Sequence, residues 1–454
     1  MVGLRVGGDR VGGVGDSATS QAWAALGGPG ELVSRVAYRG VNGLAQGRLP
    51  VRELARACVG VCSLAAAEAA AAAGGGEVAS LVVDEGAVAA AFVSERHLRV
   101  RGRAPVSFAP LSGFWRARDG WVRTHANYDH HREALVRALG PAVRTPQGLE
   151  RAVAGRSAVD VQEAAYAAGG LAVAVAPAYG DPQPLVETRV REPGPRPVPV
   201  AGARVLDLTR VIAGPVATRT LGLLGADVLR IDPPRLPESD DAYADTGFGK
   251  RSARLDLAEP GDRAVFEELL AGADVVVSGY RPGALERHGL GAEELMSRRP
   301  GLVVAELCAW GWHGPWTGRR GFDSLVQAGY GIAAAEAGAD GRPGVLPAQA
   351  LDHGTGYLIA AGVLRALAAG GGRALRFSLA GTASWLVRDI VPDGSAGSGA
   401  ADGEAYDPAP WLRTTDSGYG PLRHAAPPLA FGPGDWPRGP SRWGTDPAAW
   451  LPRA

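Results

Sequence analysis

Cysteine, lysine and methionine are scarce in this sequence of 454 residues. The cysteines are Cys58, Cys62 and Cys308. An odd number of cysteines in a long chain argues against a disulfide framework and is typical of a reducing compartment. Lys250 is the only lysine, so arginine carries almost all of the positive charge. A lysine retained in such a sequence is a candidate for a specific role.

The sequence also lacks net charge and a long uninterrupted apolar run. Its formal net charge is zero at pH 7, so no overall field predicts a nucleic-acid or membrane partner. The first thirty residues carry Asp9, Arg10 and Asp16 and have no apolar segment of the signal-peptide type. The alanine-rich run 58–73 is interrupted by Glu68 and is shorter than a bilayer span. We therefore expect a cytoplasmic protein.

Familiar phosphate and metal motifs are absent as well. The sequence contains no GxGxxG, GxxxxGK[ST] or GxSxG pattern. His125, His130 and His131 lie close together, but no second group of ligands has the spacing of a zinc finger or of an HExxH helix. We expect no metal site.

Composition divides the chain into four parts. Residues 1–191 contain glycine-rich segments, a long alanine-rich helix pattern and a predicted hairpin with a following helix over 113–139. Residues 192–200, EPGPRPVPV, are typical of a semi-rigid linker. Residues 201–390 alternate apolar β-branched segments with helix patterns, which predicts an α/β fold with a doubly wound parallel sheet. Residues 391–454 are rich in proline, glycine and tryptophan and are expected to wrap the surface.

Two segments of the chain echo each other. Residues 55–83 align with residues 351–379 without a gap, and their triple glycines coincide. Where the second segment has Asp352, the first has Arg56. An alanine-rich helix followed by glycines is a common pattern, so chance similarity and duplication both explain the echo. If the duplication is real, the first copy has lost the acidic residue.

Asp323 and Asp352 are two carboxylates in apolar, glycine-rich surroundings. Asp352 precedes a helix pattern over 357–367, where backbone N–H groups and the helix dipole favour an ionised carboxylate. Asp352 is therefore either an N-cap alone or a catalytic carboxylate beside a pocket of small residues. The corresponding alternative for Asp323 is a structural carboxylate that binds its own loop.

Six blocks follow one another over about residues 203–387: VLDLTRVIAGP, LGADVLRID, GKRSARLDL, VVVSGYRPGALERHGL, GFDSLVQAGYG and ALDHGTGYLIAAGVLRAL. In order and spacing, these blocks resemble the family III coenzyme A transferases. That family is the formyl-CoA transferase and carnitine CoA-transferase type (CaiB/BaiF), and α-methylacyl-CoA racemases share its fold. Residues 112–140 resemble the small α+β domain of the family, which normally follows the catalytic part. The resemblance implies a Rossmann-like CoA-binding domain with a smaller α+β domain, here in reversed order.

The resemblance also implies a nucleophile and a coenzyme A site. Asp352, four residues before Gly356, takes the place of the nucleophilic aspartate, and Asp323 takes that of a second acidic residue. We expect the N–H groups of Gly354 and Gly356 to stabilise a tetrahedral oxyanion. The expected coenzyme A contacts, with Lys250 and Arg281 added for their charge and loop position, are Val211, Ile212, Ala213, Lys250, Leu255, Tyr280, Arg281, Ala284, Arg287 and Arg320.

Three departures from the family pattern concern the walls of the site. Gly279-Tyr280 stands where the family usually has Asn-Phe, and Pro233 stands where some relatives have a basic residue. The glycine loop that covers the nucleophile in formyl-CoA transferase is not found. The side of the site that takes the acceptor acid is therefore undefined by the sequence.

The predicted function is transfer of coenzyme A from an acyl-CoA to a carboxylic acid through an aspartyl anhydride and an aspartyl-CoA thioester, by a homodimer. A racemase is the first alternative, but Phe322 stands where racemases have a histidine and cannot move a proton. A non-catalytic CoA-binding subunit is the second, because the domain order is rearranged and the first copy has lost its acidic residue.

Overall fold

The computed structural model describes residues 16–40, 43–44, 47–106, 108–392 and 406–453. Within these residues a seven-stranded sheet has the order β10-β9-β8-β11-β12-β13-β7. All neighbours in this sheet are parallel except β13 and β7. The strands are β7 (Glu187–Val190), β8 (Arg204–Leu208), β9 (Asp227–Asp232), β10 (Lys250–Arg254), β11 (Val275–Ser278), β12 (Val303–Cys308) and β13 (Arg373–Ser378).

The strand order confirms the predicted doubly wound α/β fold. The chain builds β8, β9 and β10 toward one edge and then returns to place β11, β12 and β13 on the other side of β8. The neighbours β8 and β11 therefore mark the point where the order reverses. In sheets of this type the crevice beyond the carboxyl ends of such a strand pair binds ligands.

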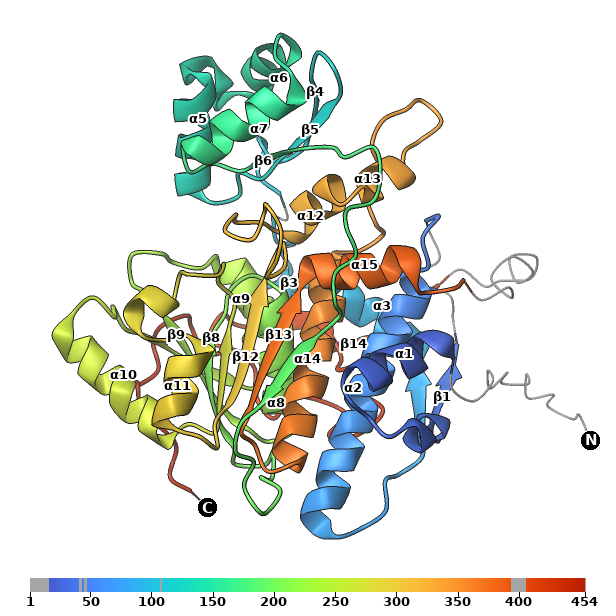
Figure 1. Cartoon of the computed structure of the whole chain (residues 1–454), viewed down its shortest axis with the longest axis vertical. Coiled ribbons are helices and arrows are strands. Elements are labelled where there is room, and N and C mark those ends of the chain that lie inside the picture. The colour runs from blue at the N-terminus through green and yellow to red at the C-terminus, as the bar shows by residue number, and fades with distance from the viewer. Residues whose placement is uncertain (1–15, 41–42, 45–46, 107, 393–405, 454) are drawn as a thin grey trace, which may run out of the picture.

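Helices cover both faces of the sheet (Figure 1), and successive strand residues pack against opposite faces. Val205, Val275 and Val303 belong to the core on the side of α8 and α14. Their neighbours Leu206 and Val276 belong to the core on the opposite side. The helices that follow the sheet strands are α8 (Ala213–Leu223), α9 (Asp240–Thr246), α10 (Pro260–Gly272), α11 (Ala292–Arg298), α12 (Asp323–Gly329), α13 (Ile332–Ala335), α14 (Ala350–Ala368) and α15 (Leu379–Arg388), with the short η3 (Glu286–His288).

The N-terminal part contains a second, smaller βαβ unit. Strand β1 pairs in parallel with β2, and α2 connects them. The echoing segments therefore have the same order of elements, α2-β2-α3 and α14-β13-α15, and α2 packs along α14 (Figure 1). The elements of this part are α1 (Ser17–Ala25), η1 (Gly30–Arg35), β1 (Val36–Arg39), α2 (Val51–Gly74), β2 (Leu81–Asp84), α3 (Glu85–Phe92), α4 (Ser94–His97) and β3 (Arg99–Val100).

Helix α2 is long and apolar enough to cross a membrane by length and composition. The expectation that its apolar run is too short is therefore wrong, because the helix has 24 residues. In this fold 67% of its apolar window is buried. The apolar residues of α2 pack in the core that α14 shares.

The predicted small α+β domain is confirmed over residues 114–174, which we call the small domain. A three-stranded sheet packs against three helices around a separate core. The hairpin β4-β5 is as predicted, whereas the third strand, β6, has only three residues and was not predicted. The elements are β4 (Phe114–Arg116), β5 (Trp121–Thr124), α5 (Asp129–Leu139), η2 (Pro141–Arg144), α6 (Pro146–Ala154), α7 (Ala158–Ala167) and β6 (Ala172–Ala174). The domain lies beyond α12 in Figure 1.

The segments around the sheet domain share its core. Strand β7 lies before the proline-rich segment 192–200 and pairs with β13. One hydrophobic core contains residues from both sides of this segment. The predicted domain limits at 191 and 201 stay predictions. In the C-terminal segment, η5 (Ala409–Trp411), β14 (Leu412–Thr415) and β15 (Leu422–Ala425) precede a stretch that lies against β9 and β10. There Trp443 Nε1 donates to Asp232 Oδ2 at 3.0 Å. Residues 393–405 of the predicted tail lie outside the described residues.

Candidate active site

A cleft of about 420 Å³ opens where the loops after β8, β11 and β12 meet the small domain. This position is the reversal point of the sheet, so the cleft lies where the fold predicts a ligand. Among the described residues that line it, Asp352 is the only acidic one. The lining residues are Tyr128, His130, His131, Arg210, Val211, Ala213, Leu236, Gly279, Tyr280, Arg281, Ala284, Arg287, Leu307, Cys308, Ala309, Arg319, Arg320, Gly321, Phe322, Asp352 and Leu379.

Asp352, the third residue of α14, lines the cleft. The N-cap of this helix is Gln349, which makes no side-chain cap hydrogen bond. The alternative that Asp352 is only an N-cap is therefore wrong. Asp352 is 6% exposed, and burial, then the nearby charges of Asp323 and Glu95, raise its pKa well above the usual range. The first turn of α14 acts in the opposite direction, because helix N-termini favour negative charge.

Asp323 does not line the cleft but binds the backbone of Asp352. It is fully buried, and its Oδ2 accepts a hydrogen bond from the N–H of Asp352 at 2.9 Å. Its Oδ1 accepts from Gln327 Nε2, and Gln327 Oε1 accepts from the N–H of Leu346 at 2.9 Å. Burial raises the pKa of Asp323. These contacts favour the structural alternative for Asp323.

Gly354 and Gly356 have a different role from the one expected. Both lie inside α14, where the helix itself uses the backbone N–H groups, so the prediction that they are oxyanion donors is wrong. A Cβ at Gly354 would lie 2.9 Å from Leu54 Cδ2, and one at Gly356 would lie 2.6 Å from the carbonyl oxygen of Ala213. The two glycines let α2 and the start of α8 approach α14.

The N-terminal part contacts the first turn of α14 at His353. This residue follows Asp352, is fully buried, and places Nε2 3.4 Å from Glu95 Oε2 of α4. Arg56, which aligns with Asp352, pairs instead with Asp16 at 2.6 Å. Glu95, which lies beyond the echoing segment 55–83, thus contributes support to the turn of Asp352.

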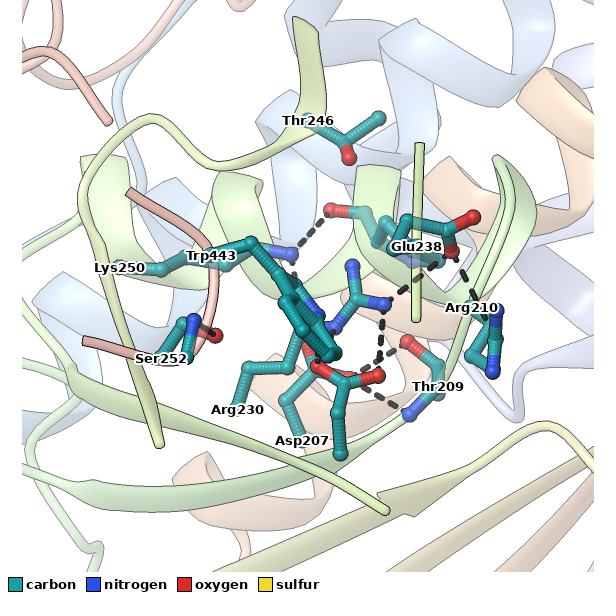
Figure 2. Close-up of polar contacts among 12 residues, drawn as sticks. Asp207, Thr209, Arg210, Arg230, Glu238, Thr246, Lys250, Ser252 and Trp443 are labelled. Carbon is teal, nitrogen blue, oxygen red and sulfur yellow. Dashed lines mark hydrogen bonds and ion pairs between the residues drawn. The ribbon is translucent and has the colours of Figure 1, made fainter. Parts of the chain in front are cut away.

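Lys250 does not reach the cleft. Its Nζ donates to Asp207 Oδ2 at 3.0 Å and to the carbonyl oxygen of Pro215 at 2.9 Å, and both side chains of the ion pair are fully buried (Figure 2). Burial lowers the pKa of Lys250 to about 8. The prediction that Lys250 binds a phosphate is therefore wrong, since its ammonium group is enclosed beneath α8.

A second buried network fixes the loop after β8. Glu238 accepts hydrogen bonds from Arg230 Nη2 at 3.2 Å, from the N–H of Val211 at 3.3 Å and from Tyr128 Oη at 2.9 Å. Arg210 also lies beside this carboxylate, with Nε 3.6 Å from Oε2 (Figure 2). Glu238 therefore joins the loop, β9 and the small domain. Val211 has a φ of 72°, which is a genuine outlier for a β-branched residue.

Most of the expected coenzyme A contacts come together in the cleft. Val211, Ala213, Tyr280, Arg281, Ala284, Arg287 and Arg320 line it. Ile212 is the N-cap of α8 just beside it. The prediction for Leu255 is wrong, because this side chain is buried in the core on the opposite face of the sheet.

Three of the cleft arginines have no acidic partner among the described residues. Arg281 Nη1 donates to the carbonyl oxygen of Gly318 at 3.5 Å, and Arg320 Nη1 donates to that of Gly169 at 3.4 Å. Arg287 contacts only the ring of His288 among its described hydrogen-bond partners. Guanidinium groups that are not neutralised by carboxylates suit an anionic ligand such as a phosphate.

The wall formed by the small domain was not predicted. Tyr128, His130 and His131 line the cleft at the start of α5. His125 stacks on Phe322, with ring centroids 3.9 Å apart and planes 3° apart. In the sequence, the spacing of the three histidines raises only the question of a metal site. The described residues contain no group of three or more His, Cys, Asp or Glu side chains suited to a metal ion.

Comparison with known proteins gives similarities that centre on the sheet domain. The family described as CoA-transferase family III matches residues 200–413. The acetyl-coenzyme A transferase nodX of Hypoxylon pulicicidum is 36% identical over 202 residues, which are 42% of this chain and 34% of that protein. The probable fatty acyl-CoA transferase Rv3272 of Mycobacterium tuberculosis is 35% identical over 182 residues, covering 37% and 46%.

Two further similarities cover a comparable share of this chain. The beta subunit of the succinyl-CoA–L-malate CoA-transferase of Chloroflexus aurantiacus is 37% identical over 184 residues, covering 37% of this chain and 45% of that subunit. A crystal structure of Rv3272 has a TM-score of 0.40 and 33% identity, covering 43% and 56% of the two chains. The chain thus spans less than half the length of these curated relatives.

Proposed function

We propose, from the match of residues 200–413 to CoA-transferase family III, that this chain is an enzyme that moves coenzyme A from an acyl-CoA thioester to a carboxylic acid. The observation that carries the proposal is that Asp352 is the acidic residue lining the cleft at the reversal point of the sheet, among the described residues. The relatives are named for different acyl groups. The proposal therefore names a reaction class and leaves the acids to a substrate panel.

The charges of the cleft support one orientation of an acyl-CoA. Arg281 and Arg287, on the loop after β11, and the N-terminus of α8 are suited to the phosphates. Asp352 lies on another wall, at the start of α14. In this orientation the thioester lies at Asp352 and the nucleotide end lies toward Arg287.

The proposed reaction proceeds by two kinds of covalent intermediate on Asp352. An oxygen of its carboxylate bonds to the thioester carbon, the C–S bond breaks, and the electron pair leaves with sulfur as the coenzyme A thiolate. The thiolate then attacks the aspartyl carbonyl of this anhydride and releases the donor acid as a carboxylate. An acceptor carboxylate attacks the resulting aspartyl-CoA thioester, and the same two steps in reverse order give the new acyl-CoA and free Asp352.

Burial of Asp352 suits this chemistry. A carboxylate is a weak nucleophile in water, where its charge is well solvated, and a dry site leaves it more reactive. The same burial raises the pKa of Asp352, so a part of the protein holds the protonated, unreactive form. We therefore expect turnover to increase with pH until Asp352 is ionised.

The test is to trap the intermediate on Asp352. A sample treated with acyl-CoA and then with hydroxylamine or borohydride should carry the label in the tryptic peptide 321–365. Fragment ions must place it at Asp352, because Asp323 and Asp340 lie in the same peptide. Asp352→Asn should lose the label and slow transfer by several orders of magnitude, whereas the exposed control Asp340→Asn should behave as wild type. Near-normal transfer by a folded Asp352→Asn variant would refute the proposal.

A racemase or epimerase of 2-methylacyl-CoA is the second candidate, and one observation favours it. Phe322 cannot move a proton, but His131 of the small domain lines the same cleft as Asp352. Such a pair could act on opposite faces of an α-carbon. Incorporation of deuterium at the α-carbon of 2-methylacyl-CoA in D2O, without acyl transfer, would support this candidate. The predicted homodimer, the cytoplasmic location and the absence of metal, nucleic-acid and membrane partners stay predictions.

A further inference from the structure

The cleft lacks the oxyanion donors that the sequence predicts. Attack by Asp352 places a negative charge on the former thioester oxygen, and hydrogen-bond donors aimed at this atom supply much of the catalysis in acyl transfer. Gly354 and Gly356 are unsuitable, because α14 uses their N–H groups. A donor must therefore come from another wall of the cleft.

A chain of contacts connects His131 with the turn of Asp352. The N–H of Asp352 donates to Asp323, which directly follows Phe322. The ring of Phe322 lies 5.9 Å from that of His131 in an edge-on arrangement. Both Phe322 and His131 line the cleft, whereas Arg287 belongs to the separate loop after β11.

The ring of His131 is neutral and fixed in position. Burial, then the charges of His130, His125, Arg320 and Arg210, lowers the pKa of His131 to about 3. The ring also makes an edge contact with Tyr128, with centroids 5.6 Å apart. A fixed neutral imidazole has one N–H group and can act as a hydrogen-bond donor without changing its charge.

The surroundings of Nδ1 indicate where the proton of this imidazole lies. Nδ1 of His131 is buried without a hydrogen-bond partner among the described residues. An unpaired buried N–H group is rarer and less favourable than an acceptor with an unused lone pair. The proton therefore belongs on Nε2, at the tip of the ring. His131 is 4% exposed and lines the cleft, so its accessible edge is the one away from Nδ1.

We infer that His131 is a catalytic residue whose Nε2–H donates a hydrogen bond to the oxyanion formed when Asp352 attacks the thioester, an inference that rests on the proposed transfer. As the bond between the Asp352 oxygen and the acyl carbon forms, the carbonyl electron pair moves to oxygen. The proton stays on Nε2 throughout. Collapse of the intermediate restores the carbonyl and expels the thiolate.

The experiment compares three variants of the full chain. His131→Phe keeps a flat ring without a donor, and its kcat for transfer should fall by about 10²- to 10³-fold, with the Kd for coenzyme A changed less than twofold. His131→Gln places an amide N–H near the position of Nε2, and its kcat should be at least tenfold higher than that of His131→Phe. The matched control is His125→Phe, since His125 stacks on Phe322 but does not line the cleft; it should stay within threefold of wild type.

Each outcome decides the inference. A folded His131→Phe variant with more than a third of the wild-type kcat overturns it, and so does a Gln variant no better than Phe. Deuterium incorporation at the α-carbon that is lost with His131 also overturns it, because the residue would then be a base. If wild type labels at Asp352 and His131→Phe labels equally fast, this inference alone fails. If wild type neither transfers nor labels, the proposed function fails and this inference with it.

Discussion

The backbone N–H of Asp352 donates a hydrogen bond to the carboxylate of Asp323 at 2.9 Å. Two carboxyl groups therefore share one buried region at the start of α14, where Asp352 lines the cleft and Asp323 does not. Like charges this close raise the pKa of the more easily protonated group. Asp323 thus both fixes the turn of Asp352 and weakens its ionisation.

The first prediction concerns Asp323→Asn. Removing the charge of Asp323 should lower the pKa of Asp352, because a neighbouring negative charge raises it. The acid limb of kcat against pH should therefore move to lower pH in the variant. Asn cannot accept from both Asp352 and Gln327 with equally good geometry, so stability should also fall, by about 1–3 kcal/mol. An unchanged acid limb in a folded variant would show that Asp352 does not control it.

The second prediction concerns the stability of Asp352→Asn against pH. The pKa of Asp352 in the folded state is raised above its unfolded value. Its contribution to stability is therefore fully present below the unfolded pKa, about 3.9, and is lost as pH increases through the raised folded pKa. The Asn variant does not suffer this loss. Its Tm relative to wild type should be higher at pH 8 than at pH 4, as measured by thermal unfolding at both values. An equal difference at the two pH values would contradict the burial argument.

The third prediction concerns the phosphate end of the cleft. Arg287→Ala should weaken coenzyme A binding in calorimetry, because Arg287 lines the cleft and has no described acidic partner. Increasing salt should weaken binding to wild type more than to the variant, since phosphate contacts are screened. Arg413→Ala is the control, as Arg413 is exposed and, among the described residues, donates to the backbone carbonyl groups of Pro410 and Leu412. Equal affinity of wild type for coenzyme A and for pantetheine without phosphates would refute the assignment.

Patterns local in sequence were sufficient for the sheet and for part of the cleft. The β-branched segments around Val205 and Val275 predict parallel strands, and the loops that follow them contain Val211 and Tyr280, which do line the cleft. These predictions succeed because strand direction alone places such loops at one edge of the sheet.

Features that depend on distant residues could not be predicted in this way. Lys250 looks like a phosphate ligand until Asp207, 43 residues earlier, is seen to pair with it. Gly354 looks like an oxyanion donor, but its lack of a side chain serves packing against Leu54. His131 reaches the cleft only because the small domain lies over the sheet edge. The local sequence Asp129-His130-His131 does not indicate that placement.

The last prediction concerns the strain in the loop after β8. Val211 has a φ of 72°, and such a conformation costs roughly 1–3 kcal/mol for a residue of this type. The hydrogen bond from its N–H to Glu238, together with the bond from Tyr128 to the same carboxylate, maintains it. Val211→Gly removes the strain but adds freedom to the unfolded chain, which offsets roughly 0.5–1 kcal/mol. The variant should therefore be more stable by about 1 kcal/mol in urea unfolding.

The same substitution should weaken coenzyme A binding, because a glycine loop is less fixed in the conformation that lines the cleft. Val211→Ala is the matched control: it keeps a Cβ and much of the strain, and both its stability and its affinity should lie between those of wild type and Gly. Stability and affinity thus move in opposite directions along the series Val, Ala, Gly. A Gly variant that is less stable than wild type would show that position 211 stores no strain. A more stable Gly variant with unchanged affinity would show that the strain is real but does not shape the cleft for its ligand.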